Sequence, residues 1–263
     1  MPTSDVGGGR IHYQDTGTGR EVVLLLHAFP LHSGMWARQV AALSPRYRVI
    51  APDYPGLGKS QPRPEPSTME ALASGIVELL GLVRVDRAAV VGLSMGGYLS
   101  FELYRRQPGL FRALALCDTR AGADTPEGAA GRETFAKNAI EKGLHWVADE
   151  MTPKLLKPQP DGAVVREVRA LIGQGTPAGV AAAQRGMARR PDSFPTLGAI
   201  ACPTLVVVGA EDTLTPPAEA EKLAAGVKGA SLARIPNAGH LPNLENPEAF
   251  NQALLEFLGK VPQ

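Results

Sequence analysis

Short, almost wholly apolar runs recur along the first half of the chain, with segments of helical periodicity between them. The runs cover residues 22–26, 47–51, 88–92 and 113–117 and are rich in Val, Leu and Ile. Continuous apolar runs of this length are typical of strands buried on both faces of a parallel sheet. The alternation predicts an α/β fold with a mostly parallel, doubly wound sheet, whose ligands bind at the carboxyl ends of the strands.

The helices between these strands are predicted near residues 35–43, 68–82 and 95–107. Ser67, with Glu70 three residues later, predicts a capping box at the start of the second helix. Such a box marks a helix start because each side chain satisfies a backbone N–H that the first turn leaves without a partner.

The strand pattern stops in the middle of the chain, where helical stretches follow one another near residues 127–142, 144–151, 162–172 and 177–189. Strands resume at residues 204–208 and 231–235, and helices follow them near residues 217–225 and 247–258. This order predicts one core of residues 1–118 and 196–263, with a helical cap of residues 119–195 inserted over the strand ends.

Charge and composition exclude several classes of protein. Lys and Arg number 27 against 26 Asp and Glu, and a net charge of +1 is too small to hold nucleic acid or an anionic membrane. No signal peptide or membrane span is recognisable, and Cys117 and Cys202 are too few for a disulfide scaffold. We therefore expect a cytoplasmic protein that acts on a small molecule, with no nucleic-acid or membrane partner and with its oligomeric state left open.

One strand-to-helix junction carries a chemical motif, Gly92-Leu93-Ser94-Met95-Gly96. Gly-x-Ser-x-Gly in this context is typical of a nucleophile elbow, where a tight turn lifts the serine hydroxyl out of the fold at a helix N-terminus. The alternative is the glycine-rich turn of a nucleotide-binding fold, but its Gly-x-Gly-x-x-Gly pattern is absent. Ser94 is therefore the predicted nucleophile.

A serine nucleophile needs a histidine base, and the base needs a carboxylate to fix its tautomer. Of the five histidines, His240 follows the last predicted strand and precedes the last helix, which places it at the same sheet edge as Ser94. Asp212 follows the preceding strand and is the first choice for the carboxylate; Glu211 is its local rival, and Asp118 follows another strand. The order Ser94, Asp212, His240 is that of the nucleophile-elbow hydrolases.

Acyl transfer also needs N–H donors for the oxyanion of its tetrahedral intermediate. The predicted donors are the backbone N–H groups of Met95 and of Phe29, which lies in the loop after an early strand. His27 in the same loop is expected to hold the loop rather than to react. The predicted pocket residues are Trp146, Met151, Leu155 and Met187 in the cap, together with Leu241. No His, Cys or Asp grouping has metal-ligand spacing, and the chemistry requires no cofactor.

Taken in chain order, these motifs resemble the α/β-hydrolase superfamily, in its branch of single-cap esterases, enol-lactonases and cofactor-free perhydrolases. The matching segments are residues 27–30, 53–60, 92–97, 203–216 and 239–240. The chain departs from the family pattern at Ala28, where glycine is usual. It departs again at Asp53-Tyr54-Pro55-Gly56, which lacks an arginine and so one expected structural ion pair.

The resemblance implies an α/β-hydrolase fold and a serine carboxylesterase that cleaves short-chain or aryl esters through an acyl-enzyme on Ser94. A lactonase of the enol-lactone type or a perhydrolase would use the same triad and stays an alternative. Carbon–carbon bond hydrolases are disfavoured, because their longer glycine-rich oxyanion loop is missing after His27. A ligand receptor without catalysis on the same scaffold is a further alternative, against which an intact triad argues.

Overall fold

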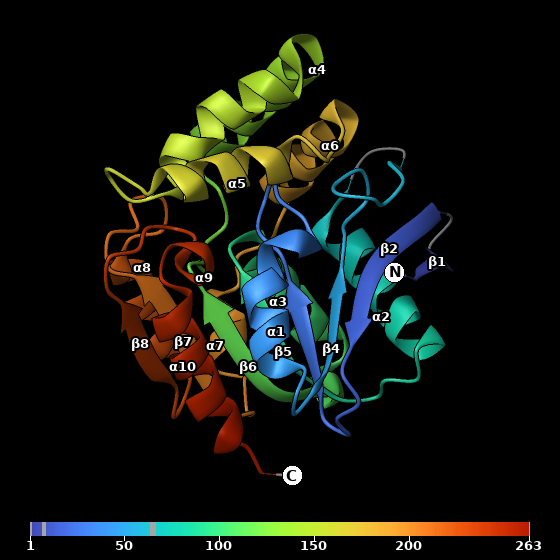
Figure 1. The fold of residues 1–263 in the computed structure, drawn as a ribbon, viewed down its shortest axis with the longest axis vertical. Helices are drawn as coiled ribbons and strands as arrows, with labels where there is room; N and C mark the ends of the chain where they lie inside the picture. The colour runs from blue at the N-terminus through green and yellow to red at the C-terminus, as the bar shows by residue number, and fades with distance from the viewer. Residues whose placement is uncertain (1, 7–8, 64–66, 263) are drawn as a thin grey trace.

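An eight-stranded sheet forms the centre of the computed structural model, which describes residues 2–6, 9–63 and 67–262 (Figure 1). The strands are β1 (Thr3–Val6), β2 (Gly9–Thr16), β3 (Val22–Leu26), β4 (Arg48–Pro52), β5 (Ala88–Leu93), β6 (Phe111–Cys117), β7 (Thr204–Gly209) and β8 (Ser231–Ile235). Their order is β1-β2-β4-β3-β5-β6-β7-β8, in which β2 pairs antiparallel with both of its neighbours and all other pairs are parallel. The predicted mostly parallel sheet is confirmed.

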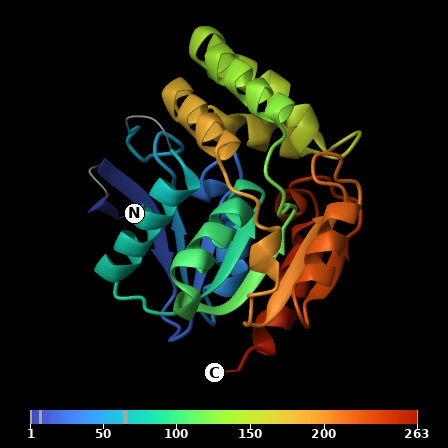
Figure 2. The same ribbon diagram turned by 180° about the vertical axis from the view of Figure 1, so that it is seen from behind.

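Helices cover both faces of the sheet, which explains why its central strands are apolar throughout. On one face α1 (Ala37–Leu43) packs against α10 (Pro247–Gly259), and on the other α2 (Met69–Leu82) packs against α3 (Met95–Arg106) (Figures 1 and 2). A further helix, α8 (Pro217–Gly226), packs on β7 and β8. Every residue of β3, β5 and β7 is buried, as expected for strands between two helical layers.

Three helices between β6 and β7 lie together beyond one end of the sheet (Figure 1): α4 (Pro126–Leu155), α5 (Gly162–Ile172) and α6 (Pro177–Ala188). They meet the carboxyl ends of the strands, since Thr176 donates its N–H to the carbonyl oxygen of Gly56, after β4, at 2.8 Å. The two helices predicted before residue 152 are the arms of α4, which bends at Gly143 (φ 77°). The exact cap boundaries stay a prediction.

Helix starts and short helices are the elements that the sequence predicts least well. The predicted capping box of Ser67 and Glu70 is wrong by one residue, because Thr68 caps α2 and accepts the N–H of Ala71 at 3.2 Å. The short helices η1 (Ser33–Trp36), η2 (Pro108–Leu110), α7 (Phe194–Leu197) and α9 (Pro242–Glu245) were not predicted as separate elements. Three or four residues carry too little periodicity to be recognised.

The state of the two cysteines and the apolar character of the helices are relevant to the predicted cytoplasmic location. Cys117 and Cys202 are both free, and β6 pairs Cys117 with Val207, well away from Cys202 in register. Within the described residues, no helix combines the length and the apolar character that crossing a bilayer requires. The cytoplasmic location stays a prediction.

Candidate active site

Ser94 occupies the turn between β5 and α3 in a backbone conformation that side chains seldom adopt, with φ 55° and ψ −111°. Such a residue stores about 1–3 kcal/mol of strain and persists only where its surroundings hold it. Here the N–H of Ser94 donates to the carbonyl oxygen of Cys117 at 2.9 Å, and the Thr119 hydroxyl donates to the carbonyl oxygen of Ser94 at 2.8 Å. The end of β6 therefore fixes the turn from both sides.

The glycines on either side of Ser94 allow close backbone packing. A Cβ on Gly96 would lie 2.1 Å from the carbonyl oxygen of Leu26, and a Cβ on Gly92 would lie 2.3 Å from that of Gly96. Both obstacles are backbone atoms within the buried centre of the fold, so neither can move aside easily. The motif is glycine at these positions because no larger residue fits.

We expect Gly96→Ala to lower the free energy of unfolding by about 3 kcal/mol or more, because the new methyl group would overlap the backbone of β3. Urea denaturation followed by circular dichroism measures the change. Gly81→Ala is the matched control: Gly81 ends a helix with nothing within 4 Å of its added Cβ, and alanine there should be neutral or stabilising by up to about 1 kcal/mol. Equal effects of the two variants would contradict the packing argument.

Asp212 and His240 form a buried pair behind the carboxyl ends of β7 and β8. Oδ2 of Asp212 lies 2.8 Å from Nδ1 of His240 and accepts the Thr215 hydroxyl at 2.6 Å, while Oδ1 accepts the N–H groups of Leu214 and Thr215 at 2.8 and 3.0 Å. Burial alone would raise the pKa of Asp212, but the hydrogen bond and charge of His240 and the Thr215 donors hold it below its usual range. Nε2 of His240 is buried and bonds to none of the described residues.

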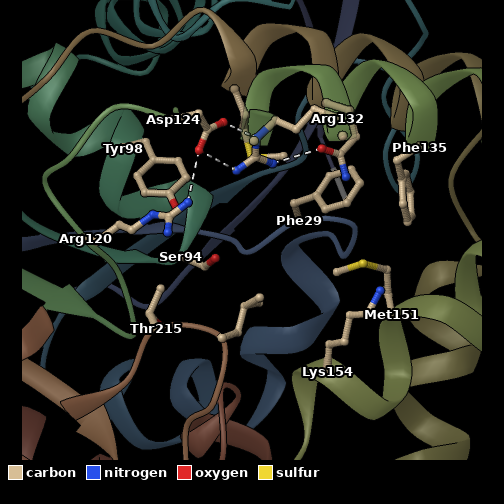
Figure 3. A pocket seen from close by; sticks show the side chains of 15 residues that line it. Phe29, Ser94, Tyr98, Arg120, Asp124, Arg132, Phe135, Met151, Lys154 and Thr215 are labelled. Carbon is tan, nitrogen blue, oxygen red and sulfur yellow. Dashed lines mark hydrogen bonds and ion pairs between the residues drawn. The ribbon is translucent and has the colours of Figure 1, made fainter. Parts of the chain in front are cut away.

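Thr215 connects the pair to the cavity that Ser94 lines. Ser94 and Thr215 line the same cavity (Figure 3), and the Thr215 hydroxyl lies 3.1 Å from Nδ1 of His240. The carboxyl ends of β5, β7 and β8 therefore bring the predicted nucleophile, carboxylate and base to one edge of the sheet.

The two rival carboxylates differ sharply from Asp212. Glu211 is exposed to solvent. Asp118 is buried after β6, where Oδ1 accepts the N–H of Gly209 at 2.8 Å and Oδ2 has no partner among the described residues. Burial raises the pKa of Asp118 well above its usual range, and the charge of Asp212 raises it further. These shifts favour the neutral form of Asp118 and the carboxylate form of Asp212 beside His240.

The two predicted oxyanion donors are the backbone N–H groups of Phe29 and of Met95, which directly follows the cavity-lining residue Ser94. Met95 is the first residue of α3, where a backbone N–H has no acceptor within the helix. Phe29 lines the cavity from the loop after β3. Among the described residues, the hydrogen bonds that hold these two turns use neither the N–H of Phe29 nor that of Met95. Both groups are thus available to a ligand.

The cavity measures about 410 Å³. The predicted residues Met151 and Met187 line it, whereas Trp146, Leu155 and Leu241 do not. The Trp146 ring packs 4.9 Å from that of Phe135, which itself faces Phe29 at 6.1 Å, so Trp146 lies one layer behind the cavity wall. Leu155 and Leu241 are completely buried in the core.

The sequence analysis did not predict the polar side chains that line the cavity. Tyr98, Arg120, Asp124 and Arg132 line it (Figure 3). Nothing in the spacing of these residues along the chain shows that they converge.

A sequence profile described as the alpha/beta hydrolase family matches residues 23–253, which include all the residues of this site. The chain belongs to the alpha/beta hydrolase family. The eight-stranded sheet of the described residues and the helices on its faces agree with that fold.

Known relatives of this hydrolase act on several kinds of substrate. It is 40% identical to a thermophilic esterase from Thermogutta terrifontis, solved with malate bound, with a TM-score of 0.96 and 100% of both chains covered. It is 30% identical to a pimeloyl-acyl-carrier-protein methyl ester esterase from Chromobacterium violaceum, over 92% of this chain and 95% of the relative. It is 27% identical to 3-oxoadipate enol-lactonase 2 from Acinetobacter baylyi, over 92% of this chain and 96% of the relative.

Asp53 of the hydrolase keeps a buried partner although the turn lacks the arginine usual in the family. Its Oδ2 lies 2.9 Å from Nδ1 of His12 and accepts the N–H of Lys59 at 2.9 Å, and its Oδ1 accepts the N–H of Ser33 at 2.8 Å. His12, from β2, is therefore a buried hydrogen-bond partner of the Asp53 carboxylate. The antiparallel pairing of β2 with β4 brings the two residues together.

His27 fixes the loop that carries Phe29. Nδ1 of His27 donates to the carbonyl oxygen of Ala28 at 3.0 Å, and Nε2 accepts the N–H of Tyr54 at 3.0 Å. These contacts agree with the structural role expected of His27. They also require one neutral tautomer, and burial lowers the pKa of His27 from 6.5 to about 4.

This shift predicts acid lability of the hydrolase. Between pH 6.5 and pH 4, His27 is protonated in the unfolded chain but stays neutral in the folded protein. Stability is therefore lost as the pH falls through this window, by up to about 3 kcal/mol from this group. Urea denaturation at pH 7 and pH 4 should show a smaller loss for His27→Gln than for the parent. His145→Gln is the control, since the His145 side chain is 84% exposed; a loss in His27→Gln as large as in this control would contradict the assignment.

Asp118, Asp212 and His240 form the one group of His, Cys, Asp or Glu within the described residues whose ligand atoms lie within 4.8 Å of one another. Three hydrogen-bond donors already point at the Asp212 carboxylate, from the Thr215 hydroxyl and two backbone N–H groups. Burial raises the pKa of Asp118 well above its usual range, which disfavours a second negative charge there. The donor set therefore suits a protonated imidazole better than a metal ion.

Proposed function

We propose that this hydrolase is a serine carboxylesterase that cleaves short-chain or aryl esters through an acyl-enzyme on Ser94. The observation that carries the proposal is the buried Asp212–His240 pair, 2.8 Å apart, whose neighbour Thr215 lines the same cavity as the strained elbow residue Ser94. The esterases among the relatives support the choice of an ester bond.

In the proposed reaction the Ser94 hydroxyl attacks the ester carbonyl while Nε2 of His240 takes its proton. Asp212, ionised and held by three donors besides His240, keeps Nδ1–H in place and stabilises the imidazolium. The N–H groups of Phe29 and Met95 receive the negative charge on the carbonyl oxygen. His240 then gives its proton to the departing alcohol, and a water molecule repeats the cycle on the acyl-enzyme.

A lactonase is the second candidate, because the enol-lactonase relative spans nearly the whole chain. A lactone is a cyclic ester, so the same steps would open it without loss of a separate alcohol. A perhydrolase would differ in using hydrogen peroxide rather than water in the second half of the reaction. A hydrolysis screen over p-nitrophenyl esters, lactones and peracid formation from acetate separates the three.

Within the ester series we expect kcat/KM to be highest for short acyl groups, because the cavity of about 410 Å³ is bounded by the rings of Phe29 and Phe135. The measurement is kcat/KM for p-nitrophenyl esters from acetate to palmitate. A value that climbs steadily to palmitate would contradict the size argument without touching the role of Ser94.

A further inference from the structure

The cavity beside Ser94 holds a local excess of positive charge. Arg120, Arg132 and Lys154 line it, whereas Asp124 is the one acidic side chain among the described residues that line it. The whole chain is nearly balanced, with a net charge of +1, so the excess does not follow from composition. In the view of Figure 3, Arg120, Arg132 and Asp124 lie above Ser94, and Lys154 lies on the opposite side of the cavity.

The carboxylate of Asp124 is shared among three guanidinium groups. Oδ1 accepts Arg190 at 2.7 Å and Arg120 at 3.0 Å, and Oδ2 accepts Nε of Arg132. Burial alone would raise the pKa of Asp124, but the hydrogen bonds of Arg190 and Arg132 outweigh it and lower the pKa to about 2. One negative charge thus faces three positive charges, and two positive charges are left over at working pH.

The three arginines differ in their access to the cavity. The Arg190 side chain is 3% exposed, donates to the carbonyl oxygens of Gly122 and Met187, and packs 4.3 Å above the Tyr98 ring, so it is a structural anchor. The Arg120 and Arg132 side chains are 36% and 18% exposed and line the cavity. Among the described residues, Arg120 makes one side-chain hydrogen bond, to Asp124.

The apolar part of the wall includes Phe29, Phe135, Met151, Met187 and Leu214. We propose that the cavity binds an ester that also carries a carboxylate, with Arg120 and Arg132 pairing with that carboxylate and the apolar wall holding the spacer between it and the ester. A guanidinium edge matches a planar carboxylate with two parallel hydrogen bonds. This inference rests on the proposed esterase function and names its substrate class: half-esters of dicarboxylic acids or acyloxy acids.

A purely structural network is the alternative, since Asp124 and Arg190 tie together the two ends of the segment that contains α4, α5 and α6. A purely structural network would need only as many positive as negative charges. Two surplus positive charges in a partly desolvated cavity would be unfavourable without a bound anion. Lys154 does not help to distinguish a carboxylate site from a structural network, because its charge is paired with Glu150 at 3.4 Å. Arg120 therefore separates the two readings best.

The test compares kcat/KM for monomethyl adipate with that for its terminal amide, and for 4-acetoxybutyrate with that for its amide. The first pair places the carboxylate on the acyl side and the second on the alcohol side. We expect the carboxylate ester to be preferred by at least about tenfold in one pair, and Arg120→Gln to lower that preference about tenfold. Arg234→Gln removes the same charge from the distant exposed Arg234–Glu221 pair and should leave both rates unchanged.

A ratio near one in both pairs, with the amide esters hydrolysed, would overturn the carboxylate site and leave the esterase proposal standing. If no ester were hydrolysed, the esterase proposal would fail, and calorimetric binding of adipate would decide the site by itself. Binding to the parent that weakens about tenfold in Arg120→Gln, but not in Arg234→Gln, would support it. No binding to the parent, or binding equally strong in Arg120→Gln, would overturn it.

Discussion

Replacing Ser94 with alanine is expected to lower kcat for p-nitrophenyl butyrate by on the order of 10⁴-fold or more, because no acyl-enzyme can form without the hydroxyl. The fold should persist, since the turn at φ 55° is no harder for alanine than for serine, and the hydrogen bonds that hold it use only the Ser94 backbone. Steady-state kinetics and the Tm of both proteins measure the two parts of this prediction. Residual activity within about tenfold of the parent would remove Ser94 from the proposed mechanism.

Replacing Asp212 with asparagine should lower kcat by roughly 10³- to 10⁴-fold while the protein stays folded. An amide can accept from Thr215 and the backbone, but it carries no charge to stabilise the imidazolium and can turn its NH₂ group toward Nδ1 of His240. Steady-state kinetics at saturating ester concentration measures the loss.

Asp118→Asn is the matched comparison for Asp212→Asn. Asp118 lies in the same buried group, but its raised pKa disfavours the charged form, so its amide should cause a far smaller loss of kcat. A severe loss in Asp118→Asn together with a mild one in Asp212→Asn would place the functional carboxylate on β6 instead of β7.

Much of the fold could be predicted because the relevant signal is local. A strand such as β3 or β5, buried between two helical layers, must be apolar at every position, and the chain shows this directly. Parallel strands then bring their carboxyl ends to one edge, so chain order was enough to bring Ser94, Asp212 and His240 together. The glycines around Ser94 predict the elbow from the sequence, because no larger side chain fits at those positions.

The polar part of the cavity wall and the buried Asp53 pair could not be predicted, because they depend on contacts between residues far apart in the chain. Asp124 and Arg190 are 66 residues apart, and His12 and Asp53 are 41 apart. Trp146 illustrates the same limit, since the packing of α4 decides that Phe135 reaches the cavity and Trp146 lies behind it. Helical periodicity identifies an apolar face but not what that face contacts.

The central claim is that Ser94 becomes acylated, and the most direct measurement is mass spectrometry of the protein after acid quenching during turnover of p-nitrophenyl acetate. The account predicts one acetyl group per molecule, on the peptide that contains Ser94, with no such adduct in Ser94→Ala. A fluorophosphonate probe should label the same residue in the parent protein. Turnover of the ester with no adduct on Ser94, or with the adduct on another residue, would contradict the account.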